Sequence, residues 1–282
     1  IEAKDELDLQ NLKLDIDRAT AKLDVLQLLT GRVQLSALII EGLGTDVNLD
    51  PFLKSDNNPK PIDWGPIFRT LRKVPVSRLA LQSASAHLFS PKLKLEVDLI
   101  ELDALILNES ERLQVRLDLQ DSDLTWGEIA SPVRLQADAS LSPQGLDITD
   151  LRVLGLGSLV RGSASFTNLP YLFLSPEGTV QVEVKAALPQ VSQLLMKMKS
   201  VPPLAGTVEA KGQIEMAQGS IVSGGFRLFG AGLKVDKFNL GQFETEGRLF
   251  NDVVRIEKIQ LTHDAGLAEV ENIEVKLTRE ND

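Results

Sequence analysis

The run Lys92-Leu93-Lys94-Leu95-Glu96-Val97-Asp98-Leu99 alternates charged and apolar residues without a break. One loop later, Leu113-Gln114-Val115-Arg116-Leu117-Asp118-Leu119-Gln120 repeats the pattern. Successive side chains of a β-strand point to opposite faces of a sheet, so each run places its aliphatic residues on one face and its polar residues on the other. The two runs predict a sheet with one apolar face that something else must cover.

The composition indicates what kind of face this is. The chain has 282 residues, of which 43% are hydrophobic but only 5% are aromatic, with two Trp and one Tyr. Aromatic side chains supply much of the packing energy of cores that contain them. We therefore expect a mainly β protein whose apolar faces are aliphatic and smooth, and too poor in bulk to fill a wide interior.

Charge and cysteine content exclude several classes of protein. The formal net charge is −10, and Lys and Arg are scattered among acids, whereas nucleic-acid binding requires a clustered basic surface. The chain has no Cys, so it has no disulfide framework and no thiolate metal site. No uninterrupted apolar run reaches the roughly 18 residues of a membrane span. Because the sequence starts at Ile1 without Met, we interpret it as a fragment of a longer protein.

Two short helices are expected between the strands. The first follows the polar loop 55–61 and runs from Asp63 to Val74, with Asp63 as its cap and basic residues at its end. The second runs from Pro189 to Lys199, where apolar residues recur at helical spacing, and Pro202-Pro203 ends it. A shorter break, a turn or a single helical turn, is expected at 26–29.

Strands fill the rest of the chain, at the spacing of a meander from 76 to 168 and again from 204 to 277. No linker composition separates these parts. We therefore predict one architecture over residues 1–282, a long curved antiparallel sheet, with a possible seam near 188–203.

Three stretches carry a resemblance to a known family. They are Ala21–Leu35, with its Leu-Leu-x-Gly turn at 28–31, then Pro75–Leu88, which follows the first predicted helix, and Pro203–Gly212, with its Pro-Leu-x-Gly-x-Val start. In this order the chain resembles the AsmA-like superfamily, and is most similar to its TamB (translocation and assembly module) branch. The resemblance covers nearly the whole sequence.

The resemblance implies a periplasmic protein of the bacterial cell envelope, anchored in the inner membrane by an N-terminal segment that this sequence lacks. It implies a U-shaped hydrophobic β-groove (a β-taco) that moves phospholipid toward the outer membrane, or that helps outer-membrane proteins to assemble. The usual partner is an outer-membrane barrel, which is expected to dock on a C-terminal region of the family that is also absent here.

Physical reasoning supports a lipid ligand independently. An exposed aliphatic face must close on itself, pack on another sheet or carry a ligand. Acyl chains suit such a face because each buried methylene contributes about 0.8 kcal/mol and requires no directional partner. The residues that we expect to contact lipid are Leu93, Leu95, Val97, Leu99, Leu113, Val115, Leu117, Leu119, Val133, Leu135, Val180, Val182 and Val184.

Two alternatives stay open at this point. The same alternation is typical of strands that line a closed sandwich or barrel core. A protein-assembly scaffold, whose exposed strand edges pair with client strands by β-augmentation, is the second functional hypothesis.

No pattern in the sequence indicates an enzyme, a metal site or a cofactor. Val153–Gly162 departs from the dinucleotide fingerprint and is interpreted as a glycine-rich hairpin. Asp121–Glu128 departs from a calcium loop and is interpreted as a polar turn. The two histidines, His87 and His263, are interpreted as surface residues of strands, since no partner for either is evident in the sequence.

Overall fold

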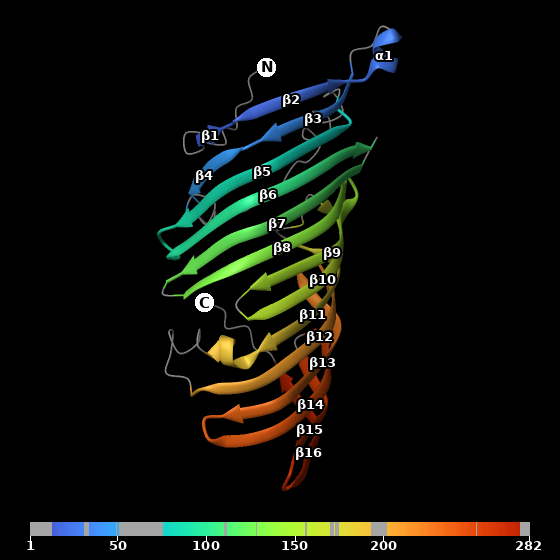
Figure 1. Ribbon diagram of the computed structural model, residues 1–282. Coiled ribbons are helices and arrows are strands. Elements are labelled where there is room, and N and C mark those ends of the chain that lie inside the picture. The colour runs from blue at the N-terminus through green and yellow to red at the C-terminus, as the bar shows by residue number, and fades with distance from the viewer. Residues whose placement is uncertain are drawn as a thin grey trace. The chain divides into compact units, whose positions relative to one another are not determined.

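A computed structural model describes residues 13–30, 34–48, 50, 76–109, 112–127, 129–155, 157–169, 172, 175–192, 202–251 and 253–276. In these residues sixteen strands are hydrogen-bonded in one mixed sheet (Figure 1). The strand order is β1-β4-β5-β6 and then sequential to β16, while β3 pairs with both β2 and β5. The prediction of a mainly β protein is confirmed.

The described residues up to Gln136 form one compact unit and those from Ala137 form a second, with the boundary inside β8. The elements of the first unit are β1 (Lys13–Asp15), β2 (Arg18–Leu23), α1 (Val25–Leu29), β3 (Leu35–Glu41), β4 (Gly44–Asn48), β5 (Arg78–Ser90), β6 (Leu95–Glu109), β7 (Arg112–Trp126) and β8 (Ile129–Ser142).

The first unit corrects the expectation of an antiparallel sheet. Strands β3 and β4 both pair with β5 in parallel, in registers that follow one another along β5. Gly42, with a φ of 65°, separates them, so they form two halves of one broken strand. A parallel pairing requires a connection of roughly a dozen residues or more, and residues 49–77 provide it. The pairs β5–β6 and β6–β7 are antiparallel as expected.

The second unit is a meander of antiparallel hairpins. Its strands are β9 (Gly145–Gly155), β10 (Ser158–Thr167), β11 (Glu177–Ala187), β12 (Leu204–Ala217), β13 (Ser220–Val235), β14 (Phe238–Phe250), β15 (Val253–His263) and β16 (Gly266–Lys276). Each pairs with its neighbour in sequence from β9 to β16. The glycine-rich hairpin predicted at 153–162 is confirmed as the β9–β10 turn, where Gly157 has a φ of 69°.

The helical predictions have different outcomes. The break at 26–29 is helix α1, which Asp24 caps by accepting hydrogen bonds from the amides of Leu26 (3.0 Å) and Gln27 (3.2 Å). Residues 188–192 are helical, at the start of the second predicted helix, and its remainder lies outside the described residues. The first predicted helix, 63–74, lies wholly outside them. The predicted turn at 121–128 is wrong as far as Trp126, because β7 continues to that residue and the turn follows at Gly127.

The apolar phase shifts by one residue within β5 and β6. Ser83 and Glu101 have φ values of 51° and 56°, in the left-handed region that L-residues rarely adopt. In β6 the half-buried Leu99 and Leu102 are separated by two exposed residues, Ile100 and Glu101. An extra residue in the strand, as in a β-bulge, keeps the aliphatic side chains on one face although they change from odd-numbered to even-numbered positions in the sequence. We call these two positions the phase-shift row.

Candidate functional site

The apolar face of the second unit is organised around β11. Val180, Val182 and Val184 occupy alternate positions of this strand and therefore share a face. The residues directly opposite them on β10 and β12 are also apolar: Ala164 and Ile214 beside Val180, Gly162 and Gly212 beside Val182, and Val160 and Ala210 beside Val184. The predicted β11 residues thus belong to an aliphatic face that extends over neighbouring strands.

The same face continues toward the C-terminal edge of this unit. Ala210 lies opposite Leu228, which lies opposite Thr245, and the row proceeds through Ile259 to Val270 on β16. A parallel row starts at Ile214 and continues through Gly224, Leu249, Val254 and Val275. Apart from Thr245, both rows are apolar or glycine.

Little protein packs against these side chains. Among the described residues, the buried apolar side chains are Ala37, Ala80, Ala84, Ala104, Leu113, Leu119 and Leu169, and the last is the only one in the second unit. Val182 is 40% exposed and Val270 is 53% exposed. A closed sandwich or barrel core would bury such residues. The described part of the second unit therefore carries an open aliphatic face.

The predicted residues of the first unit lie on two halves of the β6–β7 hairpin. Leu119, Leu117 and Val115 are directly opposite Leu102, Ala104 and Ile106. Leu95, Val97 and Leu99 instead oppose Trp126, Leu124 and Ser122, and Leu113 opposes Asn108. Leu113 and Leu119 are buried, and the other predicted residues in β6 and β7 are half-buried. Val133 and Leu135 are half-buried in β8.

Leu93 requires a correction, because the strand expected from Lys92 begins only at Leu95. Residues 91–94 form a turn in which the amide of Lys94 donates to the carbonyl of Pro91 (3.3 Å), and Lys94 has a φ of 52°. Ser90 Oγ also accepts from the amide of Leu93 (3.2 Å). Leu93 is 48% exposed in this turn and does not share the strand alternation.

One histidine has a partner that sequence reasoning missed. Nδ1 of His87 lies 2.6 Å from Oδ1 of Asp98, its direct cross-strand neighbour, and its ring stacks on Phe89 with centroids 5.4 Å apart. The imidazole and the carboxylate remain substantially exposed. Within the described ranges, no group of three His, Cys, Asp or Glu side chains has the arrangement of a metal site.

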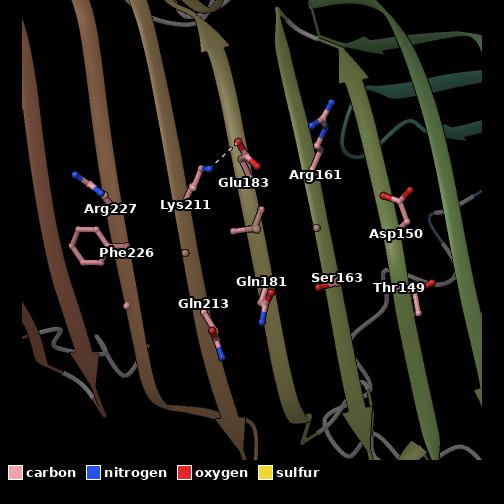
Figure 2. A pocket seen from close by; sticks show the side chains of 14 residues that line it. Thr149, Asp150, Arg161, Ser163, Gln181, Glu183, Lys211, Gln213, Phe226 and Arg227 are labelled. Carbon is pink, nitrogen blue, oxygen red and sulfur yellow. Dashed lines mark ion pairs between the residues drawn. The ribbon is translucent and has the colours of Figure 1, made fainter.

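A polar trough of about 570 Å³ crosses β9–β13 in the second unit. One of its walls is a charged row of direct cross-strand neighbours, Arg161, Glu183, Lys211 and Arg227. Its other wall is an uncharged row, Ser163, Gln181, Gln213 and Gly225, and β9 adds Thr149 and Asp150 at one end. Figure 2 shows the two rows lying across successive strands.

Strand alternation places the trough and the aliphatic face on opposite sides. Val182 lies between Gln181 and Glu183 in β11, and these two neighbours belong to the two trough walls. Because adjacent side chains in a strand point to opposite faces, the trough walls lie on the face away from Val182. The alternation within single strands predicts only a solvated polar side here, because the rows of the trough form only when β10–β13 pair in register.

Cross-strand ion pairs characterise the polar side elsewhere in this unit. Arg227 pairs with Glu244, Arg255 with Glu274, and Lys258 with Glu269. The hydrogen bond from Lys258 (2.9 Å) lowers the pKa of Glu269, and the same bond raises the pKa of Lys258. These groups are exposed or half-buried at the surface, so each pair contributes little to stability.

Comparison of the chain with protein-family models, with curated proteins and with solved structures finds no match. None of the described helices has the length and apolar character needed to cross a membrane. The fold and the two surfaces of the second unit define a β-sheet protein with an open aliphatic face backed by a charged one.

Proposed function

We propose that this chain is a lipid-conducting module whose aliphatic sheet face carries phospholipid acyl chains. The observation that supports the proposal is the open face around Val182, where aliphatic side chains continue over the strands from β10 to β16. Among the described apolar residues of that unit, only Leu169 is buried. Exposed apolar surface of this extent is typical of binding surfaces.

Acyl chains fit the chemistry of this face. Its side chains offer no charge or hydrogen bond to anchor a ligand, but they bury methylenes at about 0.8 kcal/mol each. Many equivalent weak contacts hold a chain and also let it slide, whereas a polar pocket would fix it. Headgroups stay in water at the ends of the strands. In this proposal the sheet curls into the U-shaped groove that the family resemblance implies.

The cellular setting is proposed from the resemblance alone. It is the periplasm. The proposed protein is anchored in the inner membrane and binds an outer-membrane barrel partner, in both cases through segments other than the sheet described here. The module carries out no reaction and needs no cofactor in this proposal, and its role is lipid transport for outer-membrane biogenesis.

A scaffold for outer-membrane protein assembly is the second proposal, and one observation favours it. Strand β16 pairs only with β15, and every described residue of β16 except Ile273 is exposed. An unpaired strand edge is a template for β-augmentation by another chain. Proline substitutions along β16 are expected to disable a scaffold and to leave lipid binding intact.

The experiment that tests the first proposal is native mass spectrometry of the chain purified from a bacterial periplasm, followed by lipid extraction. We expect bound phospholipid in the wild type and its loss in Val182→Asp. Gln181→Asp is the matched control, because it places the same charge one residue away on the opposite face. A folded wild-type chain free of lipid would refute the proposal, and so would equal lipid retention in the two variants.

A further inference from the structure

The polar trough contains hydrogen-bonding groups that the protein itself leaves unused. Arg161 makes no ion pair with any described residue, although most cations of this unit do. Within the same part of the chain, the side chains of Ser163, Gln181 and Gln213 make no hydrogen bond. Hydroxyl and carboxamide groups both donate and accept hydrogen bonds. The uncharged wall therefore presents unused hydrogen-bond donors and acceptors from three adjacent strands, β10, β11 and β12, to the trough.

The charge around Arg161 is unbalanced in favour of cations. Arg161 lies directly opposite Arg152 on β9, and like charges directly opposite each other destabilise a sheet. Arg152 is paired with Asp150 (2.9 Å), and Glu183 is paired with Lys211 (3.4 Å), so the nearest acids already have partners. The trough lining carries Arg161, Lys211 and Arg227 against Asp150 and Glu183. This local excess of positive charge occurs in a chain of net charge −10.

The shape of the trough indicates an elongated ligand. It extends over β9–β13, and four spacings of about 4.8 Å between neighbouring strands give a length of roughly 19 Å. Along this length one wall carries three cations, with Glu183 between Arg161 and Lys211 and paired to Lys211, and the other wall is uncharged. A complementary ligand carries anionic groups along one edge and neutral hydrogen-bonding groups along the other.

We propose that the trough binds an acidic oligosaccharide, with its carboxylates toward Arg161 and Lys211 and its hydroxyls toward Ser163, Gln181 and Gln213. Sugar hydroxyls, like the groups of the uncharged wall, are donors and acceptors at once. Guanidinium groups bind carboxylates through paired, charge-assisted hydrogen bonds. This site is separate from the lipid proposal, because it lies on the opposite face of the sheet.

Two other extended anions fit the trough less well. Single-stranded nucleic acid requires aromatic platforms for its bases, and the only aromatic residue in the trough lining, Phe226, has the strand parity of the aliphatic face. An acidic peptide in extended form alternates its side chains, so half of them would need their own pockets. Val182, Phe226 and glycines are the apolar part of the trough lining, and the side chains of the two walls are polar or charged apart from Gly225.

The test is isothermal titration calorimetry of the whole chain with tetragalacturonate, a tetrasaccharide with one carboxylate on each unit. Neutral maltotetraose and the peptide tetraglutamate serve as comparison ligands. We expect saturable binding of tetragalacturonate that weakens by about tenfold in Arg161→Gln, the usual cost of losing a charged hydrogen bond. The double variant Gln181→Ala/Gln213→Ala is expected to weaken binding as well, and all variants keep the wild-type circular dichroism spectrum.

Arg255→Gln is the control, because it removes a guanidinium that is likewise exposed from β15, outside the trough. It is expected to leave the affinity within about twofold of wild type, since a distant surface charge is screened. Absence of tetragalacturonate binding would overturn the proposal, as would equal losses in Arg161→Gln and Arg255→Gln. Tighter binding of tetraglutamate would overturn it in favour of a peptide ligand. None of these outcomes depends on lipid binding at the opposite face.

Discussion

The substitution Val182→Asp separates lipid binding from folding on the aliphatic face. Val182 is 40% exposed and lies between Gly162 and Gly212, which have no side chains to pack against it. Burying about 60% of a valine side chain contributes roughly 1 kcal/mol, so its loss leaves the fold intact. The new carboxylate can remain hydrated on the open face.

The effect on a bound acyl chain is larger. A hydrated carboxylate at position 182 would keep about three methylenes of the acyl chain from contacting the sheet. At about 0.8 kcal/mol for each methylene, the binding free energy falls by roughly 2.4 kcal/mol, which is about fiftyfold in affinity. Lipid occupancy by native mass spectrometry and stability by urea unfolding are measured on the same preparations. We expect Val182→Asp to lose lipid and to keep most of its stability.

Gln181→Asp supplies the control, because it adds the same charge to the same strand on the opposite face. It is expected to retain lipid and to weaken tetragalacturonate binding, while Val182→Asp does the reverse. If Val182→Asp retained as much lipid as Gln181→Asp, the assignment of the lipid-bearing face would be wrong.

Three further predictions concern stability and titration. Gly212→Ala should stabilise the chain by about 0.4–1 kcal/mol, because a Cβ there meets its nearest atom at 3.5 Å. Gly247→Ala should destabilise it by about 1–3 kcal/mol, because its Cβ would lie 2.6 Å from the Phe226 ring, and urea unfolding that ranks the two variants in the opposite order would refute this. Thr245→Val should cost about 1 kcal/mol in the same assay, because the buried hydroxyl donates to the Lys258 carbonyl (2.8 Å), and unchanged stability would contradict that role. Lys258→Gln should raise the pKa of Glu269 measured by NMR titration, and an unchanged pKa would refute the pairing. Because the pKa of this carboxyl is lowered in the folded chain, the small stabilisation from the pair is present above the pKa of the unfolded chain and disappears as pH falls through the pKa of the folded chain.

The positions of many strands and the faces of their side chains could be predicted from the sequence, because the two-residue alternation of a strand is visible within a few neighbouring residues. The alternation of 113–119 and 180–184 predicted strands with a shared apolar side, and the structure has them so. The prediction that the strand begins at Lys92 was wrong because the alternation of charged and apolar residues continues through a turn. The left-handed backbone of Lys94 cannot be recognised from that alternation. The parallel pairing of β3 and β4 with β5 was hidden for a different reason, since it depends on where a long connection returns.

The polar trough shows the limit of reasoning from one strand at a time. Arg161, Gln181 and Lys211 lie on three strands, and the sequence between them gives no indication of which residues become neighbours. Their registers run without a shift across β10–β11 and β11–β12, and they depend on where the connections 168–176 and 188–203 return the chain.

The phase-shift row at Ser83 and Glu101 has a consequence for how this sheet can change during evolution. In an uninterrupted strand, inserting or deleting one residue acts like a frameshift, because it sends every later side chain to the wrong face. Here β5 and β6 each already contain a position where the parity is reset by one left-handed residue. A strand that gains or loses a residue at this row alters only a bulge, while the two half-strands beside it keep their faces. Insertions and deletions between related chains should therefore accumulate at this row.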